Sequence, residues 1–337
     1  MNQNMDKTSS NNTDYLPIKS IRLAADEAVR YIDDRRHGRI ISLKTPWAKY
    51  NQVAMGGIEW FTMHTIAGAS GSGKTAILNQ LETQLIELNP TERFDILSFN
   101  FEMLARNLVA RKFSKATEKT VKDIFSADSP LSDKDFERIK ATQNKVKDMP
   151  IYYVDEAGTV EDIIKTIYYF ATKKGNDRGL LVTLDHTVLV NGKAGELERI
   201  ILVELAKMFK RAIKYFASIG KNFSVVLLSQ MNRDIEKIER MGEPGVQNYP
   251  KKADIFGGDA LYQMSDVVLV TMNPFRMGLE SYGPNTWPTK GRLYWHFIKV
   301  REGGDIIAAM TNKLHINTVD DLDLSEETQG SMLNLNN

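Results

Sequence analysis

Nearly continuous apolar runs alternate with helical patterns along this chain. Such runs predict strands that are buried on both faces, because a half-exposed strand would alternate apolar and polar residues. Helical spacing of apolar residues connects several of these runs, at residues 74–88, 159–173 and 196–218. Together they predict an α/β fold, a mostly parallel twisted sheet with helices on both faces. The predicted strands are FTMHTIA (61–67), FDILSF (94–99), IYYVD (151–155), GLLVTLD (179–185), FSVVLLS (223–229), DVVLVTM (266–272) and RLYWHFIKV (292–300).

Four segments lie outside this alternation. Residues 1–18 are polar and predict a flexible N-terminal tail, whereas residues 19–39 place apolar side chains at helical spacing and predict an amphipathic helix. Residues 233–266 form a long polar stretch of the kind that is usually a functional loop. Residues 318–337 contain five acidic residues and no lysine or arginine, which predicts an acidic C-terminal tail.

Composition narrows the class of protein. The 337 residues include 44 basic and 43 acidic side chains, a net charge of +1, so a nucleic-acid partner would need a local basic patch. Cysteine is absent, which excludes disulfides, thiol nucleophiles and cysteine-bound metals. Neither an apolar run of membrane-spanning length nor a secretory signal is found, and we therefore expect a cytoplasmic protein without a membrane partner.

The segment GASGSGKT at residues 68–75 fits the phosphate-binding pattern G-x-x-x-x-G-K-[ST]. It lies between a predicted strand and a predicted helix, so its backbone N–H groups and the helix N-terminus can both face phosphate oxygens. Lys74 is expected to reach the β- and γ-phosphates, and the Thr75 hydroxyl to bind Mg²⁺. We predict a nucleotide site formed by Gly68, Ala69, Ser70, Gly71, Ser72, Gly73, Lys74, Thr75 and Ala76.

Two pairs of carboxylates are candidates to complete this site. A P-loop ATPase needs one carboxylate near Mg²⁺ and another that orients the attacking water. In the first arrangement, Asp185 ends one predicted strand and Glu102 follows another. In the second, Asp155 and Glu156 supply both roles from a single strand, as in AAA+ ATPases. The guanine-reading pattern N/T-K-x-D does not occur, which disfavours a GTPase.

Six motifs, taken in order, resemble those of the hexameric replicative DNA helicases of the DnaB type. They are GASGSGKTA, FNFEM, LLVTLDHTVLV, VVLLSQMNR, ADIFGGDALYQMSDVVLV and FIKVREG, and the resemblance covers roughly residues 40–317. It implies a RecA-like P-loop NTPase core that hydrolyses ATP with Mg²⁺. It further implies a homo-oligomeric ring, a hexamer, that moves along single-stranded DNA and unwinds duplex DNA in the 5′→3′ direction.

The resemblance also implies roles for individual residues. Glu102 matches the glutamate that activates water, and Asp185 matches the aspartate at Mg²⁺, which favours the first arrangement. Gln230 matches a glutamine that senses the γ-phosphate and relays its presence to the DNA loops. Lys299 and Arg301 match a pair that reaches into the neighbouring subunit's ATP site. Residues i and i+2 of a strand share a face, so these two cations can approach one phosphate group together.

The helix predicted at residues 19–39 fits the family's linker helix, which packs on the adjacent subunit; the alternative is a helix packed on its own core. Because only about 40 residues precede the core, we expect a short, phage- or mobile-element-like form that lacks the large N-terminal domain of the cellular helicases. That form would act in a bacterial cytoplasm or a phage-infected host cell. His186 follows Asp185 where the family usually has an aromatic residue, and we assign it no role.

The family's DNA-contacting stretch aligns with residues 254–266, where Phe256 replaces an arginine that is associated with the DNA backbone. Other residues nearby could supply the missing charge or an accessible backbone N–H. These candidates are Arg233, Lys251, Lys252, Gly257 and Gly258.

Rival interpretations keep the ATPase but discard the unwinding. One is a RecA-like loader or regulator whose ATP hydrolysis is stimulated by DNA, and another is a nucleotide-gated assembly protein. Candidate partners besides single-stranded DNA are primase, polymerase, a loader and a single-strand-binding protein. The acidic tail at residues 318–337 either docks on such a partner or only keeps the protein soluble.

Overall fold

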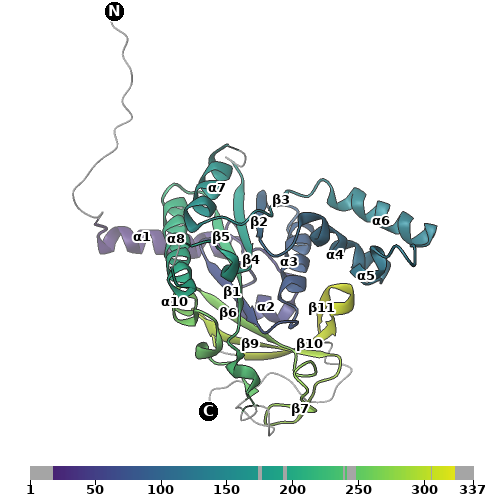
Figure 1. Ribbon diagram of the computed structural model, residues 1–337. Coiled ribbons are helices and arrows are strands. Elements are labelled where there is room, and N and C mark those ends of the chain that lie inside the picture. Colours follow the sequence, from purple (N-terminus) through teal and green to yellow (C-terminus); the bar gives the residue numbers. More distant parts are fainter. Residues whose placement is uncertain are drawn as a thin grey trace, which may run out of the picture. The chain divides into compact units, whose positions relative to one another are not determined.

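The computed structural model describes residues 18–173, 177–192, 196–237, 240, 248–304 and 306–322 (Figure 1). The chain divides into two compact units, Met1–Ile41 and Ser42–Asn337, which are considered separately. In the first unit, α1 (Ile21–Arg36) confirms the predicted amphipathic helix. The hydroxyl of Ser20 accepts a hydrogen bond from the N–H of Leu23 and caps its N-terminus.

In the described part of the second unit, nine strands form one sheet with the order β11-β10-β9-β6-β1-β5-β4-β2-β3. The strands from β6 to β3 pair in parallel, and β9, β10 and β11 extend the sheet with antiparallel pairs. The predicted α/β class with a mostly parallel sheet is therefore confirmed. The strands are β1 (Met63–Gly68), β2 (Phe94–Asn100), β3 (Ile151–Val154), β4 (Gly179–Asp185), β5 (Phe223–Gln230), β6 (Val267–Met272), β9 (Arg292–Val300), β10 (Ile306–Lys313) and β11 (Thr318–Asp321).

Helices cover both faces of this sheet (Figure 1). Helices α2 (Ala48–Val53) and α3 (Lys74–Leu88) pack on one face, and α7 (Val160–Lys173), α8 (Glu198–Ser218) and α10 (Gly258–Met264) pack on the other. Helices α4 (Ala105–Thr117), α5 (Val121–Ile124) and α6 (Asp133–Val146) lie together beside α3, and a small hairpin joins β7 (Ser281–Tyr282) to β8 (Trp287–Pro288). No described helix has both the length and the apolar character that crossing a bilayer requires.

The apolar runs of the sequence are explained by the two-sided burial of the parallel strands. In β5, Val226 and Leu228 join the core on the α3 side, whereas Val225 and Leu227 join the core on the α8 side. Successive side chains of a strand point to opposite faces, so both faces of a covered sheet demand apolar residues. This burial holds the carboxyl ends of the parallel strands in a fixed array, where the nucleotide motif begins.

Two expectations need correction. Residues Thr318–Asp321, which we assigned to the acidic tail, form the edge strand β11, because Val319 is buried and its N–H donates to the Gln80 side chain. Asp323, Glu326 and Glu327 lie outside the described residues. The long loop expected at 233–266 also contains α10, in which Leu261 is buried on the α8 side of the sheet.

Candidate functional site

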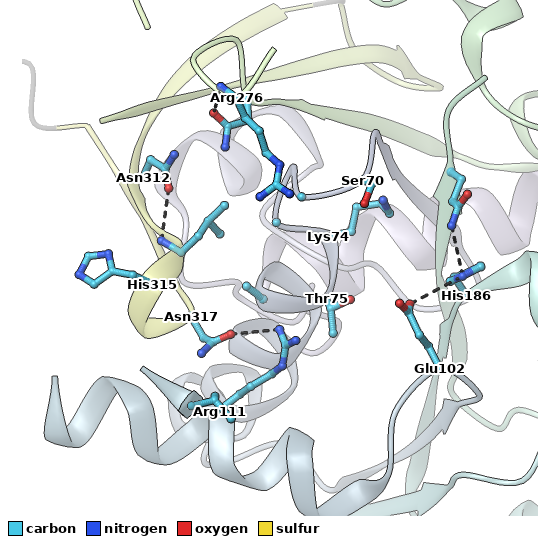
Figure 2. A pocket seen from close by; sticks show the side chains of 17 residues that line it. Ser70, Lys74, Thr75, Glu102, Arg111, His186, Arg276, Asn312, His315 and Asn317 are labelled. Atoms are coloured by element: carbon cyan, nitrogen blue, oxygen red, sulfur yellow. Dashed lines mark hydrogen bonds and ion pairs between the residues drawn. The ribbon is translucent and has the colours of Figure 1, made fainter. Parts of the chain in front are cut away.

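The predicted phosphate loop connects β1 to α3. Gly68 ends β1, the next five residues form the turn, and Lys74, Thr75 and Ala76 are the first residues of α3. Gly73 caps the helix with a left-handed φ of +95°, where a side chain would be strained. The loop borders a cavity of about 520 Å³, a volume typical of small-ligand sites (Figure 2).

Lys74 lies against the wall of this cavity. Its ammonium group donates hydrogen bonds to the carbonyl oxygens of Gly68 at 2.8 Å and Ala69 at 3.0 Å. Burial lowers the pKa of Lys74, and the negative charges of Asp185 and Glu102 oppose this shift. The amine is thus already placed at the loop whose N–H groups would cradle phosphate oxygens.

Asp185 ends β4 and is 2% exposed. Its Oδ1 atom has no hydrogen-bond partner among the described residues. Burial raises the pKa of Asp185 to about 6, while a hydrogen bond from the Thr75 side chain acts in the opposite direction. A buried carboxylate oxygen without a donor is costly unless it meets a cation or a bound water, so Thr75 and Asp185 fit a Mg²⁺ site. Three or more His, Cys, Asp or Glu side chains do not cluster anywhere in the described ranges, so such a site would draw its remaining ligands from phosphate and water.

Glu102 and Gln230 enter the same cavity from the ends of β2 and β5. His186 lies between them, with its Nε2 atom 3.7 Å from Glu102 Oε2 and 3.3 Å from Gln230 Nε2 (Figure 2). Burial lowers the pKa of His186, which favours the neutral ring. A histidine to which we assigned no role therefore connects the two candidate residues that would face the terminal phosphate.

The rival carboxylates occupy a different place. Asp155 and Glu156 are exposed after β3, the last strand at its edge of the sheet, and β5, β4 and β2 separate β3 from β1. Asp155 accepts a hydrogen bond at 3.1 Å from the N–H of Ala105, the first residue of α4. This placement favours the pair of Asp185 and Glu102.

Sequence reasoning missed one side of the cavity. Arg111 of α4 and Arg276, from the loop after β6, line it together with residues of the β10–β11 connection. Arg111 donates to the side-chain oxygen of Asn317 at 3.1 Å (Figure 2). No motif marks these residues, and those from β10 and the β10–β11 connection reach the cavity through antiparallel strands that the sequence pattern did not reveal. The end of β10 contributes Asn312, and the β10–β11 connection contributes Leu314, His315 and Asn317.

Comparison with known proteins identifies the family of this chain. Residues 42–292, more than half of the chain, match the family model described as the DnaB-like helicase C-terminal domain. The chain belongs to this family. A search of curated proteins finds no match.

Two solved structures show the same fold as this DnaB-like domain. One, described as an ATPase domain, has a TM-score of 0.73 and 16% identity, and the match covers 88% of this chain and 98% of that one. The other, described as "The Structure Of A DnaB-Like Replicative Helicase And Its Interactions With Primase", has a TM-score of 0.72 and 16% identity, with 91% and 68% covered.

Lys299 and Arg301 of this DnaB-like chain do not lie at the phosphate loop. They lie at the end of β9, which is antiparallel to β6 and therefore ends beside the start of β6 and β1. The phosphate loop follows the other end of β1, a strand that spans about 20 Å. The two cations and the loop thus lie at opposite strand ends of one sheet. We call the end that carries residues 68–76 the phosphate edge and the end that carries Lys299 and Arg301 the arginine edge.

The candidate DNA residues are only partly brought together. Lys251, Lys252 and Gly257 line one cavity of about 700 Å³ with Phe256 and with Arg199, which we had not predicted. Arg233, in a short 3₁₀ helix after β5, is not among its lining residues.

Gly257 has a structural reason of its own. Its φ is +64°, and a Cβ there would lie 2.5 Å from the Leu202 side chain, so glycine allows α10 to start against α8. Gly258 is the first residue of α10. The need for glycine at residue 257 is therefore explained without a phosphate contact.

Proposed function

We propose that this chain is an ATP-dependent replicative DNA helicase, a ring-shaped motor that moves along single-stranded DNA and unwinds duplex DNA in the 5′→3′ direction. The observation that carries the proposal is the position of two groups of candidate ATPase residues at opposite strand ends of one sheet. The phosphate loop, Asp185 and Glu102 share one edge, and Lys299 and Arg301 lie at the other. One copy cannot bring these groups to one ATP, whereas two neighbouring copies can.

The phosphate edge would bind and activate ATP as follows. Backbone N–H groups of the loop and the amine of Lys74 hold the β- and γ-phosphates. Thr75 and Asp185 hold Mg²⁺, which would neutralise phosphate charge and orient the phosphate chain when bound. Glu102 orients a water molecule in line with the terminal phosphate, and His186 Nε2 lies 3.7 Å from its carboxylate.

The far side of the cavity would receive the nucleoside. Its lining there is polar and planar, with the imidazole of His315 and, closer to Gly71 of the phosphate loop, the guanidinium of Arg276 (Figure 2). Guanidinium and imidazole groups stack on aromatic bases, and the amide groups of Asn312 and Asn317 can hydrogen-bond a ribose. The lining extends from the phosphate loop to these residues, so one cavity can take both the phosphates and the nucleoside of ATP.

The opposite edge would complete the site of the next copy. When one surface of a copy contacts a different surface of the next copy, the copies form a closed ring if the rotation between them adds up to a full circle. We propose that this ring is a hexamer. Helix α1 supports assembly, because its own unit does not bury the apolar side chains of Ile21, Val29 and Ile32. We propose that this apolar surface packs on an adjacent subunit.

Gln230 offers a direct connection between ATP and DNA. Its side chain faces His186 in the nucleotide cavity, and its backbone oxygen accepts a hydrogen bond from the N–H of Phe256 at 2.9 Å. Phe256 lines the basic cavity that also contains Lys251 and Lys252. A shift of Gln230 on hydrolysis would therefore move the candidate DNA-binding segment.

The protein partners that we propose begin with primase, because the description of one similar helicase structure names its interactions with primase. We extend the proposal to a polymerase, a loader and a single-strand-binding protein.

A second function is favoured by the charges around this cavity. Asp259 lies 2.9 Å from Lys252 and 3.7 Å from Arg199, so part of the positive charge is neutralised, and Phe256 adds none. Weaker binding of the DNA phosphates suits a loader, a regulator or a nucleotide-gated assembly protein whose ATPase responds to DNA without processive unwinding.

The two functions are distinguished by steady-state ATP hydrolysis with and without single-stranded DNA, followed by unwinding of a forked duplex with a 5′ tail. A motor is expected to show DNA-stimulated hydrolysis and to separate the strands. Stimulated hydrolysis without strand separation would favour the loader or regulator. Hydrolysis that is indifferent to DNA would favour the assembly protein, and no hydrolysis would contradict the ATPase.

A further inference from the structure

Asp266, immediately before β6, is a meeting point of three structural elements. Its Oδ2 atom accepts hydrogen bonds from the N–H of Met63 at 2.8 Å and from the ammonium of Lys210 at 2.6 Å. Its Oδ1 atom lies 3.0 Å from Nε of Arg301. The carboxylate therefore ties the end of β9 to the first residue of β1 and to helix α8.

The backbone reinforces the same arrangement. The N–H of Arg301 donates to the carbonyl oxygen of Asp266 at 2.9 Å, and the N–H of Asp266 donates to the carbonyl oxygen of Met63 at 2.7 Å. Both the main chain and the side chain of Asp266 thus hold Arg301. A residue fixed at two points in this way loses little further entropy when it binds a ligand.

Burial differs sharply across this ion pair. The side chain of Asp266 is 13% exposed, whereas that of Arg301 is 53% exposed. The contact uses Nε, and a guanidinium has two further nitrogens that form a planar fork suited to phosphate oxygens. Asp266 therefore fixes the base of the fork and leaves the terminal nitrogens to another partner.

Lys299 shows why an anion is needed here. Its ammonium donates to the carbonyl oxygens of Tyr262 at 2.6 Å and Gln263 at 3.0 Å, near the end of α10. Burial lowers the pKa of Lys299, and the positive charge of Arg301 lowers it further. The two cations face one region and repel each other, and the negative charge of Asp266 offsets that repulsion.

We propose that Asp266 is a positioning residue of a composite ATP site: it orients Arg301 toward the phosphates bound to the neighbouring subunit. The inference rests on the proposed function, since it assigns a partner to the arginine that acts in trans. The same carboxylate is bonded to the start of β1, and the end of β1 is this subunit's own phosphate loop. Asp266 thereby connects the arginine given to the neighbour with the strand that carries the subunit's own ATP site.

The variant Asp266→Asn tests this role, because it removes the charge and keeps an oxygen that can accept from Met63. Asp266→Glu, which keeps the charge but shifts it by one methylene, serves if the asparagine variant fails to fold. The matched control is Asp95→Asn at the start of β2. Asp95 is also buried and paired with an arginine, with Arg178 Nε 2.6 Å from its carboxylate, but it lies away from β9.

The measurement is ATP hydrolysis by each variant alone and mixed with Lys74→Ala subunits, together with binding of a fluorescent ATP analogue. We expect Asp266→Asn to lower kcat between about tenfold and a hundredfold, as misplaced groups do, with unchanged analogue affinity. Mixing should restore part of the activity, because Lys74→Ala subunits still supply a well-placed Arg301. Asp95→Asn should retain wild-type kcat.

Three results overturn the inference: wild-type kcat in both Asp266 variants, a loss that mixing does not restore, or an equal loss in Asp95→Asn. The proposed function fails separately, and takes this inference with it, if the wild-type chain does not hydrolyse ATP or if Arg301→Ala hydrolyses it at the wild-type rate.

Discussion

The two edges of the sheet differ in how they are built. At the phosphate edge, one continuous segment, residues 68–76, supplies the loop, the lysine and the start of α3. At the arginine edge, Met63, Lys210, Asp266 and Arg301 come from four distant parts of the chain. The first edge surrounds a cavity that can hold a ligand, whereas the second presents a half-exposed guanidinium. In the proposed shared site, the second edge would supply one part and the first edge of another molecule would supply the other.

An aspartate at each edge makes the same point electrostatically. Asp185 has an oxygen without a donor among the described residues, and burial raises its pKa to about 6. Asp266 has donors or cations at both oxygens. The carboxylate at the phosphate edge can therefore receive a cation. At the arginine edge, the charge of Asp266 is already neutralised, and Arg301 presents a positive charge of its own.

The largest expected effect is at the arginine edge. Arg301→Ala should lower kcat for ATP by about 10³–10⁵, the range found when an arginine supplied in trans is lost. Binding of a fluorescent ATP analogue should be unchanged, because the phosphate loop is intact. Arg93→Ala, which removes an exposed arginine paired with Asp177, is the matched control and should behave as wild type. Wild-type turnover by Arg301→Ala would contradict a role of the arginine edge in ATP hydrolysis.

The next effect is at the phosphate edge. Glu102→Gln should lower kcat by about 10²–10⁴, because the amide cannot accept a proton from water. Glu156→Gln, the same change on the exposed loop after β3, should leave steady-state hydrolysis intact. The reverse outcome, loss in Glu156→Gln and turnover in Glu102→Gln, would favour the AAA+ arrangement instead.

Replacing each aspartate by asparagine should change stability in opposite directions. The pKa of Asp185 is raised on folding to about 6, so the native protein binds its proton more tightly and loses stability as the pH rises from about 4 to about 6. In metal-free and nucleotide-free buffer at pH 7.5, Asp185→Asn should therefore be more stable than wild type by about 1–3 kcal/mol. Its advantage should shrink at pH 5. Asp266→Asn should be less stable, because Lys210 and Arg301 lose their counter-charge.

Urea unfolding at the two pH values measures these differences. An Asp185→Asn variant that is less stable than wild type at pH 7.5 would contradict the cost of burying this carboxylate.

The smallest effect concerns the connection from the phosphate edge to DNA. Phe256→Arg should strengthen binding of single-stranded DNA a few-fold and increase the salt dependence of the affinity by about one unit of slope. Fluorescence anisotropy at several salt concentrations measures both quantities. Phe256→Leu, which adds no charge, should leave the slope unchanged. An unchanged slope in Phe256→Arg would place the DNA elsewhere.

Local patterns predicted the strand, the glycine turn and the helix of the phosphate edge, since these follow one another along the chain. The order of the parallel strands decides that Glu102 and Asp185 meet the loop while Asp155 does not, and local patterns contain no such information. Residues Asn312–Asn317 reached the cavity through the antiparallel strands β10 and β11, whose weak patterns we did not recognise. The contacts of Asp266 depend on pairings between distant segments, so local sequence patterns could not predict them either.

The most direct test of the account is to mix two inactive variants, Lys74→Ala and Arg301→Ala, and to measure ATP hydrolysis. Each variant alone should be nearly inactive. In an equimolar ring with random order, roughly a quarter of the interfaces would combine an intact phosphate loop with an intact arginine, because each interface joins two different surfaces. If the site is shared between subunits, the mixture regains hydrolysis in about that proportion. A mixture as inactive as its two components would contradict a site shared between subunits.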